Sequence, residues 1–169
     1  FTNSIKEDDA LRHSYNSLAE KTFGLSFEDF YQNGYWTDKY IPYSLIDDGK
    51  VIANASVNIF KSRYNGKEKR CIQIGTVMTD LDYRNQGLSR YLIERILSEW
   101  KETCDIMYLF ANDRVLDFYP KFGFVKAVEY QCSRPITPTK GRVRKLDMSH
   151  AGDRALLKRY YTCLLYTSP

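Results

Sequence analysis

Residues 77–89, VMTDLDYRNQGLS, decide the fold of this chain. The apolar start is typical of a strand end, and residues 88–100 place apolar side chains at helical spacing. The loop between them ends in Gly87. The first N–H groups of a helix have no partner within the helix and carry partial positive charge. We therefore predict a strand, a loop and a helix whose first turn suits a phosphate or pyrophosphate group.

Three residues of this loop favour anion binding. Gly87 lets the backbone approach an anion where a Cβ would collide, Ser89 adds a small hydroxyl donor, and Arg84 adds positive charge. Taken alone, a glycine at a helix start is more often part of an ordinary turn. Other phosphate loops fit less well, because the chain has no Gly-Lys-Ser/Thr sequence and only Gly87 could begin a dinucleotide-binding motif.

Two helices and three strands are expected ahead of this loop. The patterns of apolar residues predict helices over residues 7–22 and 26–34, followed by strands over residues 40–48, 51–60 and 68–79. Asp-Gly and Asn-Gly pairs separate these strands and are typical of hairpin turns. We therefore expect the three strands to be antiparallel neighbours.

After the helix over residues 88–100, the chain returns to strand patterns. Residues 105–111 form a continuous apolar run, which is typical of a buried parallel strand. We then expect a short helix capped by Asn112 or Asp113, a last core strand over residues 124–132, a short strand over residues 143–148 and a basic helix from about residue 152. This order predicts an α/β domain with a mixed sheet.

The composition is that of a folded, soluble domain. The chain has 169 residues, of which 43% are hydrophobic and 27% charged, so it suits one domain with an appendage and is too apolar to be disordered. The longest apolar run, from Ile106 to Ala111, is much shorter than the ~18 residues of a membrane helix. The N-terminal residues show no signal-peptide pattern, and we predict a cytoplasmic protein with no membrane partner.

Cysteine spacing and charge argue against two further kinds of site. The four cysteines lie about thirty residues apart, without a Cys-x-x-Cys pair or a nearby histidine, so no metal site is expected. The net charge is +4, and basic side chains gather in residues 134–159. A solvated basic surface explains this pattern better than a nucleic-acid-binding patch, and no nucleic-acid partner is expected.

Two motifs of the chain resemble those of a known family. Arg84-x-x-Gly87-x-Ser89 is similar to the acetyl-CoA motif, Gln/Arg-x-x-Gly-x-Gly/Ala, of the GNAT superfamily of N-acetyltransferases. Downstream, Asn112 and residues 115–124 are similar to the family's Asn-x-x-Ala-x-x-Leu-Tyr-x-x-x-Gly-Phe stretch. The chain departs from the family twice: Ser89 replaces Gly or Ala, and the first residue of 115–124, a valine, replaces Ala.

The resemblance covers about residues 5–133 and implies the GNAT fold, a mixed, mostly antiparallel sheet with flanking helices. In that fold, the strands that end near Thr79 and begin near Asp105 are parallel and splay apart. Residues 1–137 are therefore interpreted as a GNAT acetyltransferase domain. Residues 138–169 are interpreted as a basic C-terminal extension, the truncated start of a further module with a non-native tail.

The resemblance also implies acetyl-CoA as the co-substrate, without a metal. Its pantetheine arm would lie along the free backbone of Val77 and Thr79, next to Asn112, and its pyrophosphate would lie on the N–H groups from Arg84 to Ser89. The implied cofactor-binding residues are Val77, Met78, Thr79, Arg84, Asn85, Gln86, Gly87, Leu88, Ser89 and Asn112.

The implied reaction is direct attack of a primary amine on the acetyl carbonyl in a ternary complex. Tyr119 is the candidate catalytic residue, as a hydrogen-bond donor to the departing sulfur, because tyrosine titrates at about 10 and a thiol at about 8.5. A backbone N–H near Met78 or Thr79 is the candidate contact for the oxyanion. Gln73 stands where some members have a glutamate base and cannot accept a proton, so water, held by Asp80 or a backbone carbonyl, is the expected base.

The acceptor amine, of a small molecule or a peptide, is not identified by the sequence. Residues 26–48 interleave aromatic and acidic side chains, which is typical of a wall that binds a cationic amine and equally of a buried aromatic core with solvated acids. The predicted function is N-acetyl transfer. A non-catalytic acyl-CoA-binding sensor and a nucleic-acid binder are the alternatives, and a homodimer remains open.

Overall fold

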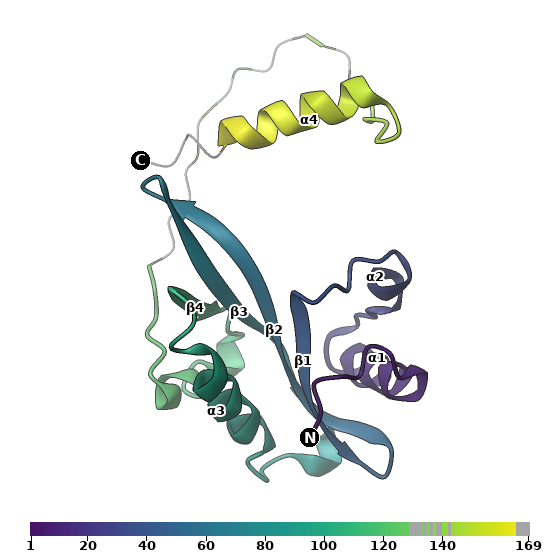
Figure 1. Ribbon diagram of the computed structural model, residues 1–169, viewed down its shortest axis with the longest axis vertical. Helices are drawn as coiled ribbons and strands as arrows, with labels where there is room; N and C mark the ends of the chain where they lie inside the picture. Colours follow the sequence, from purple (N-terminus) through teal and green to yellow (C-terminus); the bar gives the residue numbers. More distant parts are fainter. Residues whose placement is uncertain (129–132, 134, 136, 138–139, 142, 165–169) are drawn as a thin grey trace. The chain divides into compact units, whose positions relative to one another are not determined.

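A computed structural model describes the chain except residues 129–132, 134, 136, 138–139, 142 and 165–169. The chain divides into two compact units, Phe1–Ala127 and Val128–Pro169. The boundary predicted after residue 137 lies where the structure describes the chain only in part, and it stays a prediction. The first unit contains the sheet and the helices that cover it (Figure 1).

The elements of the first unit follow the predicted α/β order. They are α1 (Asp9–Phe23), α2 (Glu28–Gln32), β1 (Tyr40–Asp47), β2 (Lys50–Tyr64), β3 (Lys67–Thr79), the 3-10 turn η1 (Leu81–Tyr83), α3 (Leu88–Trp100), β4 (Ile106–Leu109), and the 3-10 turns η2 (Asp113–Val115) and η3 (Tyr119–Phe122). The two helices and three strands predicted ahead of the loop are confirmed within a few residues at each end, and so is the helix after it.

The four strands form one mixed sheet in the order β1-β2-β3-β4. The first three strands are antiparallel neighbours. β3 and β4 are parallel and pair from Cys71↔Ile106 to Ile74↔Leu109. This arrangement confirms the predicted mixed sheet with a parallel pair. Figure 1 shows α1 and α2 on one side of the sheet and α3 on the other.

Local sequence determines where α1 begins and ends. The Asp8 side chain accepts a hydrogen bond from the Leu11 N–H at 3.0 Å, which supplies a partner that the first turn lacks. At the other end, Gly24 adopts the left-handed conformation, with φ 69°, and its N–H donates to the Glu20 carbonyl at 2.8 Å. The apolar face between these two caps packs on the sheet.

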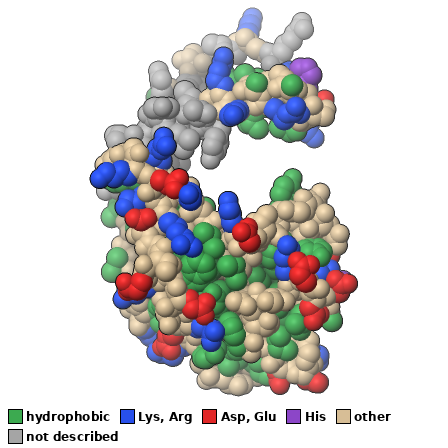
Figure 2. Space-filling model, in the orientation of Figure 1, with side chains coloured by type: hydrophobic (Ala, Val, Ile, Leu, Met, Phe, Trp, Pro, Cys, Tyr) green, Lys and Arg blue, Asp and Glu red, His purple; other side chains and the backbone are tan. Residues whose placement is uncertain are grey.

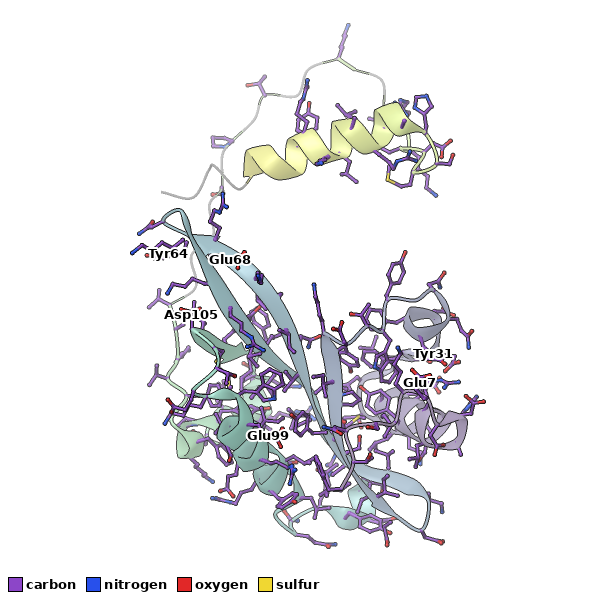
Figure 3. All side chains as sticks on the ribbon, viewed as in Figure 1. Glu7, Tyr31, Tyr64, Glu68, Glu99 and Asp105 are labelled. Atoms are coloured by element: carbon purple, nitrogen blue, oxygen red, sulfur yellow. The ribbon has the colours of Figure 1, made fainter. Side chains whose placement is uncertain are left out.

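Each face of the sheet is covered by its own hydrophobic cluster. On the side of α3, called the α3 face, the buried members include the aliphatic residues Ala53, Ala55, Val57, Ile72, Ile74, Leu92, Ile93 and Ile96. On the side of α1, called the α1 face, the buried cluster combines aromatic and aliphatic residues: Ile5, Tyr15, Leu18, Ala19, Trp36, Tyr40, Val51 and Met78. Figure 3 places Tyr31 on the side of α1 and α2, and Glu99 on α3.

β4 is the last strand of the sheet in the described part of the chain, and it is more exposed than the buried strand that its apolar sequence predicts. Ile106 is 46% exposed, and Phe110, just beyond the strand, is 75% exposed. Within the described residues, no strand lies on the outer side of β4, which explains this exposure. Residues 124–128 are in no strand, and residues 129–132 of the predicted last core strand lie outside the described residues.

Two 3-10 turns, η2 and η3, replace the short helix predicted after Asn112. The Asn112 side chain makes no capping hydrogen bond to η2. Pro120 lies in η3, where it has no backbone N–H to donate, and Gly123 ends this turn with φ 88°. The missing donor and the left-handed residue keep the turn short.

In the second unit, α4 (Ala151–Leu164) confirms the basic helix predicted from about residue 152. Asp153, in its first turn, accepts two hydrogen bonds from the Arg144 guanidinium, both at 2.6 Å, and one from the Asp147 N–H at 2.8 Å. The Arg144 hydrogen bonds, and then that of Asp147, hold the pKa of Asp153 well below its ordinary value. Residues 143–148, predicted as a strand, are in no strand.

Candidate functional site

β3 carries a bulge at Thr76, shortly before the loop that precedes α3. Ser56 of β2 lies opposite Gly75, and Asn54 lies opposite Met78, so β3 has one residue more than β2 in this interval. Thr76 takes up the extra length with φ 49°, in the left-handed region that β-branched residues rarely adopt. Such a bulge bends the strand and increases its twist.

The bulge shifts the alternation of β3 side chains by one residue, so that odd-numbered residues after it lie on the face that even-numbered residues occupy before it. Before it, Ile72 and Ile74 lie in the cluster on the α3 face. After it, Val77 packs against that same cluster, and Met78 lies in the cluster on the α1 face. Strict alternation along a regular strand would instead send Met78 to the α3 face. The bulge is therefore required for both clusters to be complete.

β3 also loses β4 as a neighbour at this point. The last pair between the two strands is Ile74↔Leu109, whereas β3 continues to Thr79. Within the described residues, the stretch Gly75–Thr79 has no strand partner on this side, and we call it the unpaired edge of β3. A sheet edge presents free backbone N–H and C=O groups with which an extended ligand can pair.

The ladder between β2 and β3 determines which residues offer those free groups. The Asp80 N–H donates to the Ile52 carbonyl at 2.8 Å, and hydrogen bonding alternates along an antiparallel pair. The backbone groups of Met78 therefore point to β2, and those of Val77 and Thr79 point to the unpaired edge. The oxyanion contact is expected from an N–H near Met78 or Thr79; of these two residues, Thr79 has its N–H at the unpaired edge, whereas the Met78 N–H belongs to the ladder.

The loop before α3 contains two residues in the left-handed conformation. Asn85 has φ 62°, and Gly87, the residue that precedes α3, has φ 79°. The Gly87 carbonyl accepts the Tyr91 N–H at 3.0 Å, which begins the helix. A Cβ built on Gly87 meets no atom within 4 Å. Its backbone conformation therefore favours glycine, and the space beside it is open to a ligand.

Two side-chain contacts join this loop and helix to the end of β3. The hydroxyl groups of Thr79 and Ser89 lie 2.8 Å apart. The Arg84 side chain turns back to the same strand end, with Nε 3.5 Å from the Thr79 carbonyl oxygen. The structure thus brings Thr79, Arg84 and Ser89 together. Around them, Asn85, Gln86 and Gly87 are exposed and Leu88 is half-buried.

A cavity of about 470 Å³ lies between this strand end and α1. Its lining consists of Leu18, Lys21 and Thr22 from α1, with Thr79, Asp80, Leu81, Asp82 and Arg84 from the end of β3 and the following residues. Two residues of the predicted cofactor set, Thr79 and Arg84, therefore border an open space. Both acidic and basic side chains face it.

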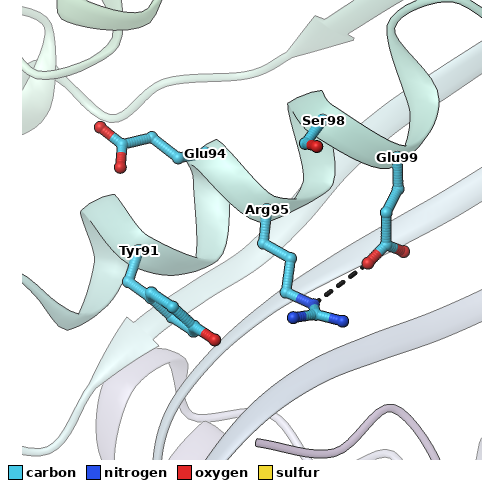
Figure 4. A pocket seen from close by; sticks show the side chains of 5 residues that line it. All are labelled: Tyr91, Glu94, Arg95, Ser98 and Glu99. Atoms are coloured by element: carbon cyan, nitrogen blue, oxygen red, sulfur yellow. Dashed lines mark ion pairs between the residues drawn. The ribbon is translucent and has the colours of Figure 1, made fainter.

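Another cavity, of about 400 Å³, lies along the outer surface of α3 (Figure 4). It is lined by Tyr91, Glu94, Arg95, Ser98 and Glu99. An ion pair crosses it, with Arg95 Nε 3.1 Å from Glu99 Oε1. Because no residue of the predicted site lines this cavity, we do not assign it to the candidate site.

Tyr119, the predicted catalytic residue, begins η3 and is 8% exposed. Its ring packs against Phe118 and Phe124, and it belongs to the α3-face cluster to which Val77 also contributes. Burial raises the pKa of the Tyr119 hydroxyl above its ordinary value. Among the described residues, the Tyr119 side chain has ring contacts and no hydrogen bond.

Three further candidates are Asn112, Gln73 and Asp80. Asn112 is exposed at the start of η2. Gln73 is half-buried before the bulge, where β3 still pairs with Tyr108 of β4. The Asp80 carboxylate follows the edge directly and accepts the Asp82 N–H at 3.2 Å, so it caps η1.

The aromatic side chains of residues 26–48 mainly build the core. Trp36, Tyr40 and Tyr43 are 1%, 7% and 1% exposed, whereas Tyr35 is 66% exposed. The aspartates of this segment are exposed: Asp29, Asp38, Asp47 and Asp48. The structure therefore favours a buried aromatic core with solvated acids over a wall that binds a cationic amine.

A buried polar network under the bulge is not among the sequence predictions. It joins Asn54 and Ser56 of β2 to Tyr40 and Thr76. The sequence contains a signal for it, because polar and apolar residues alternate through the centre of β2: Ala53, Asn54, Ala55, Ser56, Val57 and Asn58. Alternation usually indicates one solvated face. Here the polar face is covered by α1 and its neighbours.

The described residues show no group of three or more His, Cys, Asp or Glu side chains that could hold a metal ion. In the same part of the chain, no helix is long and apolar enough to cross a membrane. The face of the first unit shown in Figure 2 carries acidic and basic side chains interspersed around an apolar centre.

Comparison with solved structures finds this arrangement in other proteins. An acetyltransferase from Trypanosoma brucei aligns with a TM-score of 0.58 and 21% identity, over 73% of this chain and 92% of that chain. For the glucosamine-6-phosphate N-acetyltransferase of Arabidopsis thaliana, the TM-score is 0.58 and the identity 19%, over 75% and 91%. For a predicted acetyltransferase of Clostridium acetobutylicum, solved with acetyl-CoA, the values are 0.56, 18%, 71% and 87%. At these identities, the likeness concerns the fold.

A family model described as the acetyltransferase (GNAT) domain matches residues 4–127. Comparison with curated proteins gives no match. The matched residues span most of the chain and nearly all of the first compact unit, including the unpaired edge and the loop before α3. The chain therefore belongs to the GNAT family of acetyltransferases.

Proposed function

We propose that this protein transfers the acetyl group of acetyl-CoA to a primary amine of a small molecule or a peptide. The unpaired edge of β3, which leads directly into the exposed loop before α3, is the observation that carries the proposal. An extended pantetheine arm can pair with such an edge, and a diphosphate can bind at the helix start that follows. Membership of the family, and the acetyl-CoA held by the Clostridium acetobutylicum protein, support this donor.

Backbone groups would hold most of the coenzyme. We assign the arm to the N–H and C=O groups of Val77 and Thr79, because these face the unpaired edge, with Asn112 as a further contact. The pyrophosphate is assigned to the N–H groups from Arg84 to Ser89, where the helix dipole is positive. The Arg84 guanidinium would add a charge-assisted hydrogen bond.

The proposed reaction forms a C–N bond and breaks the C–S bond of the thioester. A neutral amine attacks the acetyl carbonyl, and the carbonyl oxygen gains negative charge that a backbone N–H can stabilise. The N–H of Val77, at the bulge, is assigned to this oxyanion. The C–S bond then breaks, and the proton lost by the amine nitrogen finally resides on the coenzyme A thiol. The products are the acetylated amine and free coenzyme A.

Tyr119 is assigned a hydrogen bond to the departing sulfur. Because burial raises its pKa, the phenol stays protonated at neutral pH and can donate. Full transfer of its proton to a thiolate is uphill by ~2 kcal/mol for unperturbed groups, and burial of the phenol increases this cost. Tyr119 would therefore stabilise the leaving thiolate, while the proton of the amine completes the reaction through water.

No side chain is assigned as the general base. Gln73 has an amide that cannot accept a proton at useful pH, and the Asp80 carboxylate caps η1. We therefore assign deprotonation of the amine to water. The same observation supports a second candidate function, a sensor that binds an acyl-CoA without turnover.

Titration with coenzyme A tests the proposed binding site. Gly87→Ala places a Cβ where the diphosphate would approach, and we expect it to weaken binding about tenfold or more, measured by calorimetry. Gly49→Ala is a matched control, since Gly49 also has a positive φ, 73°, with no atom within 4 Å of a built Cβ. Both variants should lose about 1 kcal/mol of stability from backbone strain. Absence of binding by the wild type, or equal affinity of the two variants, would contradict the site.

Turnover distinguishes an enzyme from a sensor. Acetyl-CoA is incubated with polyamines, aminoglycosides, amino acids and Lys peptides, and release of the free thiol is followed. Tyr119→Phe should lower kcat about tenfold or more, without changing coenzyme A affinity. Tyr43→Phe, which changes another buried tyrosine of the α3-face cluster, should retain turnover. Unchanged turnover in Tyr119→Phe would remove its assigned role, and coenzyme binding without acetylation of any amine would favour the sensor.

A further inference from the structure

A side chain of β2 holds the bulge of β3. Asn54 is fully buried, and its Nδ2 donates to the Thr76 carbonyl oxygen at 2.9 Å. The same Nδ2 donates to Ser56 Oγ at 2.9 Å, and its Oδ1 accepts from Ser44 Oγ at 2.9 Å. The amide of Asn54 therefore has partners on β1, β2 and β3.

The Thr76 side chain is fixed by the same network. Its hydroxyl lies 3.2 Å from the Tyr40 hydroxyl, which accepts from Ser56 Oγ at 3.1 Å and shares a short hydrogen bond with Tyr15. Among the described residues, no buried side-chain N or O atom lacks a partner. A fully satisfied buried network favours a single geometry, because any displacement leaves a buried polar atom unpaired.

The bulge depends on such a partner. A β-branched residue in the left-handed region is strained, and the extra residue at Thr76 interrupts the regular ladder between β2 and β3. Thr76 is half-buried, and loss of the hydrogen bond to its carbonyl would destabilise this conformation further. The Asn54 amide supplies to Thr76 the donor that the ladder supplies to a regular strand residue.

Peptide geometry connects this hydrogen bond to the unpaired edge. The carbonyl of Thr76 and the N–H of Val77 belong to the same peptide group, which is planar and trans. They therefore point in opposite directions. When Asn54 holds the carbonyl, the orientation of the Val77 N–H is fixed as well.

We propose that Asn54 is a positioning residue of the acetyl-transfer site. Through its hydrogen bond to the Thr76 carbonyl, it directs the Val77 N–H to the position of the thioester carbonyl. Asn54 touches neither donor nor acceptor and acts only through this peptide group. The inference rests on the proposed function, because it gives the Val77 N–H a carbonyl to bind.

Three variants isolate the hydrogen bond from the rest of the network. Asn54→Ser introduces an uncharged side chain that is too short to reach the Thr76 carbonyl. Asn54→Asp keeps the shape and can still accept from Ser44, but a carboxylate cannot donate to Thr76. Ser44→Ala is the matched control, because it removes a buried hydrogen bond of Asn54 Oδ1 and leaves the Nδ2 bond in place. Melting curves identify the temperature at which each variant is folded.

The first measurement compares the affinities of acetyl-CoA and coenzyme A and needs no turnover. The two ligands differ in the acetyl carbonyl, so a well-directed Val77 N–H should make acetyl-CoA the tighter ligand. We expect Asn54→Ser and Asn54→Asp to lose most of this preference, while coenzyme A binds as in the wild type. Ser44→Ala should keep the preference. An unchanged ratio of affinities in a folded Asn54 variant would overturn the proposal.

The second measurement separates kcat from KM. The Asn54 variants should lose about tenfold or more in kcat, with KM for acetyl-CoA within about threefold, because the lost interaction matters most in the transition state. Ser44→Ala should lose less than about twofold. Equal losses in the Ser44 and Asn54 variants would reduce Asn54 to a structural residue and overturn the proposal. Failure of the proposed function differs, since the wild type would then bind neither ligand, or would bind both and acetylate no amine.

Discussion

The two faces of β2 meet different surroundings. On the α3 face, Ala53, Ala55 and Val57 are fully buried among aliphatic side chains. On the α1 face, Asn54 and Ser56 are fully buried within a network of hydrogen bonds. Packing on the first face has no preferred direction, whereas the hydrogen bonds on the second act over fixed distances and angles.

The two faces therefore contribute differently to the free energy of unfolding and to the geometry of β3. Apolar burial contributes free energy roughly in proportion to area. A buried hydrogen bond contributes little net free energy, yet losing one of its partners is costly. We therefore expect substitutions on the α3 face to change mainly the free energy of unfolding. Substitutions on the α1 face should also change the orientation of the unpaired edge.

The largest expected effect is a loss of stability on the α3 face. Leu92 of α3 is fully buried in the aliphatic cluster. Leu92→Ala should lower the free energy of unfolding by about 3 kcal/mol, because it removes apolar contacts and leaves a cavity. Urea unfolding followed by circular dichroism measures this loss.

Glu94 of the same helix provides the control for Leu92. Its side chain is exposed, so Glu94→Ala should change the free energy of unfolding by no more than about 0.5 kcal/mol. If Leu92→Ala cost less than about 1 kcal/mol, the α3 face would not be the closely packed layer described above. Coenzyme A affinity, measured where both variants are folded, should stay at the wild-type value.

A smaller effect is expected from a single hydroxyl on the α1 face. Tyr40→Phe removes the group that contacts Ser56, Thr76 and Tyr15, and it should cost about 2 kcal/mol because buried polar atoms lose a partner. Tyr43→Phe is the control on the α3 face. The Tyr43 hydroxyl donates to Glu99, whose side chain is 37% exposed, and accepts from Trp100 Nε1 at 2.8 Å. Both partners belong to residues that are not fully buried, so water can replace the hydroxyl at a cost of about 1 kcal/mol.

The same two variants differ in coenzyme binding and in alkaline solution. Tyr40→Phe should weaken the preference for acetyl-CoA over coenzyme A, because it loosens Thr76, and Tyr43→Phe should not.

Burial raises the pKa of Tyr40, so the stability that the neutral Tyr40 provides is complete below pH ~10 and falls as pH rises toward the folded-state pKa. Between pH 10 and 11, the wild type should therefore lose stability more steeply than Tyr40→Phe, by up to about 1 kcal/mol per pH unit. Identical slopes in urea unfolding would contradict a neutral, buried Tyr40.

The sequence predicts the elements of this fold better than it predicts their surroundings. The helix spacing of residues 88–100 and the hairpin turns depend on neighbours along the chain, and the structure confirms both. The burial of β4 depends on whether another strand lies beside it, which its apolar sequence does not encode. Ile106 has an apolar side chain in an apolar run, yet it is 46% exposed.

The candidate site is predictable to the same extent. The loop residues Arg84, Gly87 and Ser89 are found from a local motif, and the structure brings Arg84 and Ser89 to the same strand end. The bulge is not found, because it results from the pairing of β2 with β3 and from contacts of Asn54 across the sheet. One trace remains in the sequence: Ile72, Ile74 and Val77 cannot all share one face of a regular strand.

The extra residue at Thr76 also limits how this segment can change in length. Deleting Thr76 would give a regular ladder in which Val77, Met78 and Thr79 keep the faces that they have now, because Thr76 is the extra residue of β3. The deletion would instead remove the carbonyl to which the buried Asn54 amide donates, together with the bend that the bulge introduces. We therefore expect a chain that lacks Thr76 to keep its hydrophobic clusters but to lose the strand geometry before the loop, whereas deletion of one residue after the bulge would move the strand end out of register with β2.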